Sequence, residues 1–176
     1  MRLPPLPAAH WDDRTRDALR PLLPRARRNP EGAGPAMSTL VRHPDLTEAF
    51  LGFSVYLLFR SSLPPRVREL AILRVAHRTN CAYEWTHHVG FAATQGFTED
   101  DIAAIRNGTP ADEFDRTVVT AVDELLEKSD LSDPTWAILS EHLTEQQRMD
   151  LVFTIGGYNL LAMAFNTFGV TPEHER

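Results

Sequence analysis

The residue types best suited to chemistry gather in one short segment of this 176-residue chain. The only cysteine, Cys81, is followed by Glu84 and His88. At about 100° per residue, these three positions fall within a stripe roughly 60° wide on a helix, so thiol, carboxylate and imidazole share one face. His87 points about 120° away. Such a cluster between packed helices suits proton transfer, because burial and mutual interaction bring the pKa values of carboxyl and imidazole groups toward neutrality.

Glu69 lies twelve residues before Cys81 and joins this face only if the helix is interrupted. An unbroken helix would leave it about 120° from the cysteine direction. Thr79 and Asn80 supply the interruption, because their side-chain oxygens favour N-cap positions. We therefore expect one helix to end near Arg78 and the next to begin at or just before Cys81.

Each of these residues also has a structural interpretation. Cys81 could be a small buried hydrophobe, and Glu84 could cap the helix start. His88 could be a core histidine bonded to Glu69, which is compatible with catalysis because the bond would fix its tautomer. The ionisation of the thiol stays open, since the helix dipole favours thiolate while the nearby carboxylate opposes it.

Three stretches resemble the carboxymuconolactone decarboxylase and alkylhydroperoxidase D superfamily. They are Arg-Glu-Leu-Ala-Ile-Leu-Arg-Val-Ala (68–76), the C-x-Y-E-W-x-x-H block (81–88) and Gly-Phe-Thr-Glu-Asp-Asp-Ile (96–102). In the peroxidase branch a glutamate precedes C-x-x-C, and a histidine follows four residues after the second cysteine. By position these correspond to Glu69, Cys81, Glu84 and His88. The second thiol is missing, so an intramolecular disulfide cycle is excluded in a chain with one cysteine.

The resemblance to the decarboxylase branch implies cofactor-free acid/base chemistry on a small carboxylated or lactone substrate. In this hypothesis His88, oriented by Glu69, shuttles a proton and Glu84 acts as a second acid or base. Arg74 is our candidate to hold a substrate carboxylate through a two-pronged bond. Tyr83 and Trp85 are candidate substrate contacts, although packing is the simpler role for both.

Two alternatives remain open at this stage. In the first, the chain is a one-cysteine peroxidase, in which Cys81 becomes a sulfenic acid and an external thiol reduces it. In the second, it is a non-catalytic helical assembly or small-molecule-binding module. We expect no metal, because Cys81, Glu84 and His88 on a single helix span too long a stretch to surround one zinc ion.

Composition narrows the class of protein. The net charge of -6 argues against duplex nucleic acid and anionic membranes as partners, and 43% hydrophobic residues suffice for one domain with a core. A single cysteine fits a reducing cytoplasm. No apolar run reaches the roughly 20 residues that a membrane span needs.

The elements that must position the site are all helical, because no segment alternates with period two. We expect an all-α bundle of seven to eight helices, with residues 1–35 as an N-terminal extension carrying one short helix and 36–176 as the family-like domain. Pro24–Pro35 reads as a loop. The last helix, about 145–168, is apolar over much of its circumference. We therefore expect it to be buried in part against other subunits. The resemblance implies a homo-oligomer, trimer or hexamer.

Overall fold

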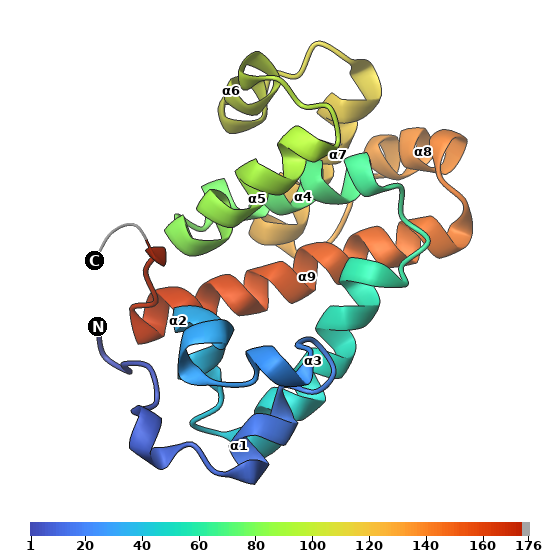
Figure 1. The fold of residues 1–176 in the computed structure, drawn as a ribbon. Helices are drawn as coiled ribbons and strands as arrows, with labels where there is room; N and C mark the ends of the chain where they lie inside the picture. The colour runs from blue at the N-terminus through green and yellow to red at the C-terminus, as the bar shows by residue number, and fades with distance from the viewer. Residues whose placement is uncertain (174–176) are drawn as a thin grey trace. The chain divides into compact units, whose positions relative to one another are not determined.

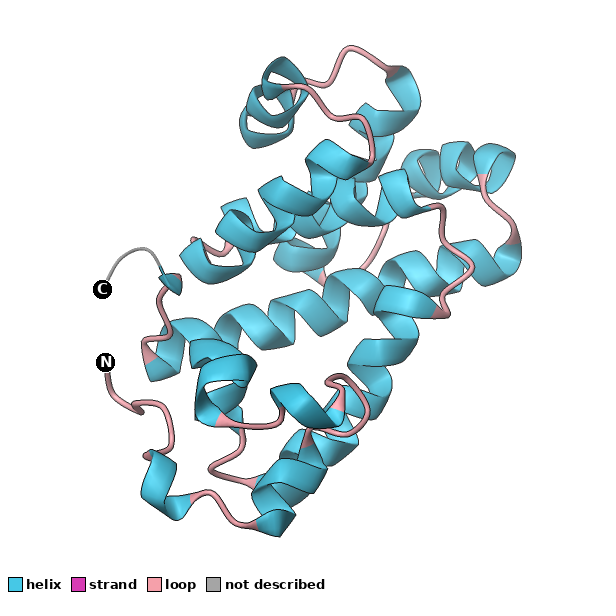
Figure 2. Cartoon of the chain, in the orientation of Figure 1, coloured by secondary structure: helices cyan, strands magenta, loops and turns pink. Residues whose placement is uncertain are grey.

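The computed structural model describes residues 1–173, and every regular element in this range is a helix (Figure 2). Nine α-helices and two short 3-10 segments follow one another along these residues (Figure 1). The all-α prediction is therefore confirmed, with one or two more helices than the sequence indicated.

The chain divides into two compact units. The first comprises Met1–Arg60 and the chain from Ala164 onward, and the second comprises Ser61–Met163. Helix α2 (Pro30–Leu40) runs through residue 35, where the sequence analysis ended the N-terminal extension. The predicted domain boundary stays a prediction.

Helix α2 corrects the expected loop at residues 24–35. Asn29 is its N-cap and accepts a hydrogen bond from the backbone N–H of Gly32 at 2.8 Å, and Pro30 occupies the first helical position. Asn-Pro therefore begins a helix here, because proline lacks the N–H that the first turn leaves unbonded anyway. The helix is kinked at Gly34, whose φ of 69° is left-handed.

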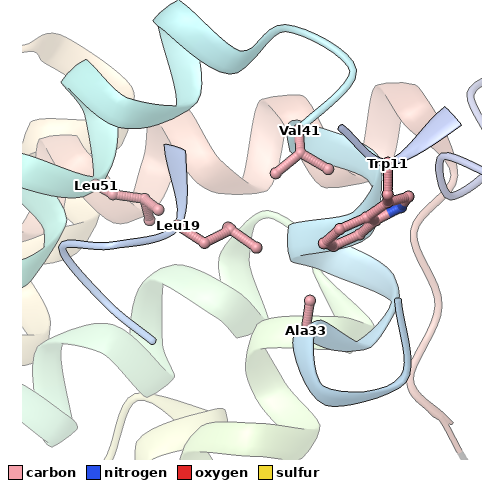
Figure 3. Close-up of a cluster of buried hydrophobic side chains, with 5 residues drawn as sticks. All are labelled: Trp11, Leu19, Ala33, Val41 and Leu51. Atoms are coloured by element: carbon pink, nitrogen blue, oxygen red, sulfur yellow. The ribbon is translucent and has the colours of Figure 1, made fainter. Parts of the chain in front are cut away.

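The first unit also contains α1 (Asp13–Ala18) and α3 (Pro44–Phe59), which pack against each other. A buried apolar cluster fills this unit (Figure 3). It consists of Trp11, Leu19, Ala33, Val41 and Leu51. Trp11 and Leu19 thus anchor α1 and its flanking residues in this core.

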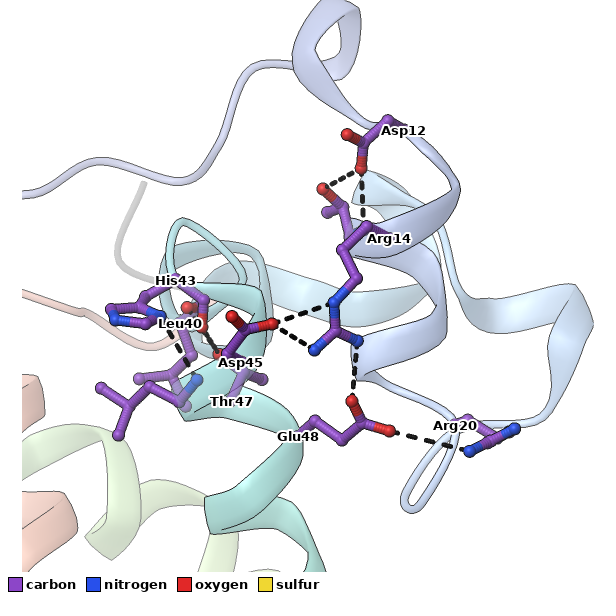
Figure 4. A network of polar contacts seen from close by, with 10 residues as sticks. Asp12, Arg14, Arg20, Leu40, His43, Asp45, Thr47 and Glu48 are labelled. Carbon is purple, nitrogen blue, oxygen red and sulfur yellow. Dashed lines mark hydrogen bonds and ion pairs between the residues drawn. The ribbon is translucent and has the colours of Figure 1, made fainter.

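A set of ion pairs joins α1 to α3 on the surface (Figure 4). Arg14 pairs with both Asp45 and Glu48, and Glu48 also lies 3.7 Å from Arg20. Arg14 and Arg20 therefore have carboxylate partners within the chain. Exposed pairs of this kind contribute little stability.

Helix α4 (Pro65–Arg78) is the most buried helix of the second unit. Every residue from 69 to 76 is buried, and the helix packs chiefly against α5 (Ala82–Thr94) and α7 (Glu113–Lys128). Because no face of α4 is free of neighbours, its charged residues Glu69 and Arg74 must find partners inside the protein.

Capping residues close in sequence determine where three further helices begin. Thr98 and Asp101 form a capping box at the start of α6 (Glu99–Asn107). Ser132 caps α8 (Asp133–His142), and Thr144 with Gln147 caps α9 (Glu145–Phe168). These ends are predictable because they depend on short-range hydrogen bonds.

Helix α9 lies at the residues predicted for the last helix, about 145–168. Its apolar circumference is not wholly covered, because Met149, Phe153, Leu160 and Met163 are each half exposed. By length and composition α9 could cross a membrane, and 44% of its most apolar window is buried. This is weak evidence for a span, since the core helix of a soluble protein passes the same test.

Candidate functional site

The connection between α4 and α5 determines which residues meet. The N–H of Asn80 donates to the carbonyl of His77 at 3.1 Å, and the N–H of Cys81 donates to that of Ala76 at 2.9 Å. With Asn80 at φ 52°, this is a Schellman ending of α4. The predicted interruption is confirmed, but its chemistry differs: Asn80 ends α4 in the left-handed conformation, and Cys81 is the N-cap of α5.

Cys81 is buried beneath the surface, with 1% of its area exposed. Burial raises the pKa of its thiol to about 11; the backbone N–H groups of Glu84 and Tyr83 oppose this rise, and the Glu84 carboxylate adds to it. The sequence left this balance open. In the structure desolvation outweighs the helix start, so the thiol is protonated at neutral pH.

His88 lies between two carboxylates. Its Nδ1 is 2.6 Å from Oε2 of Glu69 on α4, and its Nε2 is 3.3 Å from Oε2 of Glu84 on its own helix. All three side chains are at most 8% exposed. The structure therefore brings together the side chains of Glu69, Glu84 and His88, as the sequence predicted.

The protonation of His88 follows from this arrangement. Burial of the ring is the largest single influence and lowers its pKa, but the hydrogen bonds and charges of Glu69 and Glu84 together raise it to about 9. The imidazole thus carries a proton on both nitrogens at neutral pH. It is a buried cation held at both ends by a carboxylate.

Arg68 and Tyr158 complete the surroundings, and sequence reasoning missed both. Arg68 Nε lies 3.3 Å from Oε1 of Glu69, the oxygen that His88 leaves free. The ring of Tyr158, 4% exposed on α9, meets the His88 ring edge-on with centroids 5.1 Å apart. Arg68 directly precedes Glu69 in sequence, whereas no local signal relates Tyr158 to residues 70 positions away.

The charges of the site balance. Arg68 and the His88 imidazolium face the carboxylates of Glu69 and Glu84 in the order plus, minus, plus, minus. Burying two unopposed carboxylates would cost several kcal/mol, so each cation offsets desolvation of its neighbour. Tyr158 stays neutral, because burial and the two carboxylates raise its pKa well above the usual value.

One aromatic neighbour of His88, Phe91, reaches the surface of the protein. The ring of Phe91 lies 5.4 Å from that of His88, edge to face, and 54% of Phe91 is exposed. His88 is therefore flanked by a buried ring, Tyr158, and by a ring that reaches solvent. Phe91 follows His88 by three residues on α5, the spacing at which helix side chains contact.

Arg74 has no role in this cluster. Its guanidinium bonds both carboxylate oxygens of Asp123 on α7, at 2.8 and 2.6 Å, and donates to the carbonyls of Ile105 and Arg106 at the end of α6. These bonds engage every nitrogen of the group. The structure thus does not support the prediction that Arg74 holds a substrate carboxylate; it joins α4 to α6 and α7 instead.

Tyr83 and Trp85 lie on other faces of α5. The Tyr83 ring packs on that of His87, and the Trp85 ring meets His77 and the guanidinium of Arg106. Neither has a described contact with His88. These contacts are packing contacts, and a substrate-binding role for Tyr83 and Trp85 stays a prediction.

No group of three or more histidine, cysteine, aspartate or glutamate side chains within residues 1–173 is arranged to hold a metal ion. Glu69 and Glu84 instead bond opposite nitrogens of one imidazole. Both imidazole nitrogens are therefore engaged, and the arrangement is one of hydrogen bonds that can hold and move a proton.

The family model for the carboxymuconolactone decarboxylase family matches residues 44–126, a segment that includes Glu69, Cys81, Glu84 and His88. The comparison with curated protein sequences found no match.

Several solved structures share the fold. An uncharacterized peroxidase-related protein from Ralstonia eutropha JMP134, called an alkylhydroperoxidase AhpD core, superposes with a TM-score of 0.78 at 17% identity, covering 99% of this chain and 95% of that one. An uncharacterized peroxidase-related protein from Silicibacter sp. TM1040 gives 0.72 at 13% identity, covering 99% and 94%. A protein of unknown function from Agrobacterium tumefaciens gives 0.66 at 21% identity, covering 74% and 93%. At these identities the likeness is one of fold.

Proposed function

We propose that this chain, whose residues 44–126 match the carboxymuconolactone decarboxylase family, catalyses cofactor-free acid/base chemistry on a small carboxylated lactone or a related enolisable acid. One observation carries the proposal: the His88 imidazole lies between two buried carboxylates, 2.6 and 3.3 Å from its nitrogens, while the thiol at the start of the same helix has a pKa raised to about 11. This set favours proton transfer over thiolate attack.

The two ends of the imidazole have different roles in this proposal. The shorter bond, from Nδ1 of His88 to Glu69, comes from a neighbouring helix and fixes the orientation of the ring. The longer contact, from Nε2 to Glu84, is the one that a substrate can replace or share. Nε2 of His88 and the Glu84 carboxylate are thus the acid and the base, and Glu69 is a positioning residue.

The proton balance of the reaction is simple. In decarboxylation the bond between the carboxylate carbon and the α-carbon breaks, CO₂ leaves, and the electron pair remains as an enolate stabilised by the lactone carbonyl. His88 Nε2–H then protonates the α-carbon, and the imidazole regains a proton from water. In isomerisation, Glu84 removes one carbon-bound proton and His88 supplies another. Neither route needs an oxidant or a metal.

Cys81 and Tyr158 would border the reacting atoms without changing charge. The neutral thiol is a weak donor, and the neutral phenol is a stronger one that could stabilise a developing enolate oxygen. Arg68 would oppose the negative charge of Glu69 and of an incoming carboxylate. We also place the protein in the cytoplasm, because a single buried cysteine suits a reducing compartment.

A one-cysteine peroxidase is the second candidate, and one observation favours it. Cys81 is the N-cap of α5, where backbone N–H groups stabilise a thiolate. The thiolate would attack the terminal oxygen of a hydroperoxide, releasing an alcohol and leaving a sulfenic acid. Two equivalents of an external thiol would then restore Cys81, forming water and an external disulfide. We rank this candidate second because the sulfur of Cys81 is buried.

The test is a turnover screen over carboxylated lactones and enolisable acids, run in D₂O so that carbon protonation is read as deuterium incorporation by mass spectrometry. We expect Glu84→Gln and His88→Gln to lower the rate of exchange or decarboxylation by about 100-fold or more. The exposed residues Glu99 and His10 provide the matched controls Glu99→Gln and His10→Gln. If the site variants exchange deuterium as fast as the controls, the acid/base proposal is wrong.

A further inference from the structure

Helix α4 carries four arginines, and one of them is much less engaged than the others. Arg68 has a single contact among the described residues, that of its Nε with Oε1 of Glu69 at 3.3 Å, although its side chain is only 15% exposed. The other three pair with carboxylates of α7 at 2.6–2.9 Å: Arg66 with Asp115, and Arg74 and Arg78 with Asp123. Arg68 is therefore a largely buried cation with donors to spare, next to the site.

The spare donors of Arg68 form one edge of its guanidinium. The group has five N–H donors in a rigid plane, and a carboxylate fits a pair of them in parallel. Because Nε faces Glu69, the edge formed by the two terminal nitrogens is left for a second acceptor. Neither nitrogen belongs to the fully buried atoms that lack a partner in the described chain, so both remain in contact with solvent. A small anion can therefore reach this edge.

A second donor without a partner lies on α9. Thr154 is 0% exposed, and its hydroxyl has no hydrogen-bond partner within the described chain. In other helices the threonine hydroxyl donates to the carbonyl four residues back at 2.9–3.0 Å, as in Thr39, Thr117 and Thr120. Thr154 forgoes that bond to the carbonyl of Asp150. A buried hydroxyl that gives up its backbone acceptor needs another partner.

Two contacts of α9 place Thr154 beside the site. Asp150 accepts bonds from the backbone N–H and the hydroxyl of Ser62, just before α4, at 2.6 and 2.7 Å. Tyr158 meets the imidazole of the site. Thr154 lies midway between these contacts and, four residues from Tyr158, on the same face of α9. The charge of Arg68 also acts on the phenol of Tyr158, where it opposes the rise in pKa. This face of α9 is thus turned toward the first half of α4, which carries Arg68.

We propose that Arg68 and Thr154 anchor a carboxylate of the substrate, Arg68 through its two terminal nitrogens and Thr154 through its hydroxyl. This inference rests on the proposed function and names the groups by which that site recognises its substrate. Arg74, first considered for this role, has no free nitrogen, whereas Arg68 has two. Pairing with a cation stabilises a carboxylate against loss of CO₂, so the anchored group stays on the product.

Isothermal titration calorimetry at pH 7 tests the anchor with two probes, the carboxylate of γ-butyrolactone and its neutral carboxamide. Wild-type protein should bind the carboxylate at least about 10-fold more tightly than the amide. Arg68→Gln should remove this preference, and Arg68→Lys should retain part of it, because lysine keeps the charge but lacks the planar fork. Arg78→Gln is the matched control. It removes the same charge about 15 Å further along α4, beyond the screening length of about 8 Å at physiological ionic strength, and should not change the preference.

A second variant separates binding from folding. Thr154→Val keeps the shape of the side chain and removes a hydroxyl that has no partner in the described chain. The free energy of unfolding should therefore stay the same or rise, while carboxylate binding should weaken about 5-fold. A threonine with a purely structural role would show the reverse, a loss of stability with unchanged binding, and would be removed from the anchor.

The anchor and the reaction can fail separately. Equal binding of the carboxylate and the amide by wild-type protein would overturn the anchor, and so would carboxylate binding that survives Arg68→Gln or is matched by inorganic phosphate. A preference that depends on Arg68, without deuterium incorporation into any tested acid, would support the anchor and contradict the acid/base proposal. Deuterium incorporation with the same KM in Arg68→Gln and in wild type would contradict the anchor and leave the reaction in place.

Discussion

The imidazole of His88 and the carboxylate of Glu69 form a 2.6 Å hydrogen bond between α5 and α4, across nineteen residues of sequence. This bond exists because α4 ends in a Schellman turn at Asn80, so that α5 folds back along it. An unbroken helix would have kept the two side chains on different faces. The turn therefore supplies the geometry, and burial gives the bond its strength.

Replacing Glu69 should change the protonation of His88. In Glu69→Gln the shorter of the two carboxylate bonds is lost, so the pKa of His88 should fall from about 9 toward the ordinary value of 6.5. The pKa is measured from the ¹⁵N chemical shifts of the imidazole during a pH titration. The same variant should lower turnover about 100-fold through misorientation of the ring. An unchanged His88 pKa would mean that Glu69 does not hold the proton.

Stability should fall as the pH rises through the titration of His88. Its pKa is raised from 6.5 to about 9 in the folded state, so the folded protein binds the proton more tightly than the unfolded chain does. The stabilisation is complete below pH 6.5 and disappears as the pH rises through 9, amounting to up to about 3 kcal/mol.

Urea denaturation at pH 6 and at pH 9.5 measures this difference. The matched comparison is His88→Gln, which should be less stable at pH 6 and should lack most of the change between the two pH values. An equal loss of stability in wild type and variant would assign the pH dependence to other groups.

Cys81 should react slowly with electrophiles. With a pKa of about 11 the thiolate fraction at pH 7 is roughly 100-fold below that of a free cysteine, and burial restricts access further. Iodoacetamide labelling of the native protein, followed by intact mass, should therefore be at least about 100-fold slower than labelling of the urea-unfolded chain. Rapid sulfenylation by a small dose of hydrogen peroxide would instead favour the one-cysteine peroxidase.

The part of the site that depends on residues close in sequence could be predicted. Cys81, Glu84 and His88 share a helix face by simple periodicity, and Glu69 needs only the interruption that Thr79 and Asn80 indicated. The extent of the last helix, α9, was predicted as well, because its apolar run and its capping residues Thr144 and Gln147 are local features of the sequence.

The features that could not be predicted depend on contacts distant in sequence. Arg74 was assigned to a substrate because a guanidinium group binds a carboxylate in two-pronged fashion, yet the carboxylate that it binds is Asp123, 49 residues away. Tyr158 reaches His88 from a helix whose phase relative to α5 is set by packing alone. Likewise, the balance of helix dipole against burial at Cys81 depends on how deeply α5 is covered.

The start of α2 was missed for a different reason. Asn29-Pro30 and the nearby glycines are typical of loops, but Asn29 serves as N-cap and Pro30 as the first helical residue. The same residue types begin a helix or form a turn, depending on whether the next residues can pack. Here Ala33 and Val41 have a core to pack into, since both lie in the cluster of the first unit.

The bonds of Arg74 give a last prediction, in which stability and catalysis separate. Arg74→Met leaves Asp123 without its two-pronged partner and the carbonyls of Ile105 and Arg106 without a donor, so the free energy of unfolding should drop by about 3–5 kcal/mol. Gly108 should be sensitive as well, because its φ of 77° is left-handed and an added Cβ would lie 3.2 Å from the Arg74 guanidinium. Chemical denaturation measures both changes.

The control is Arg116→Met. Among its described bonds, the Arg116 guanidinium donates only to the loop carbonyls of Pro110 and Ala111. This substitution should therefore lower the free energy of unfolding by less than Arg74→Met does. If Arg74→Met folds with wild-type stability but raises KM for a carboxylated substrate, the arginine binds substrate after all and its structural role is wrong.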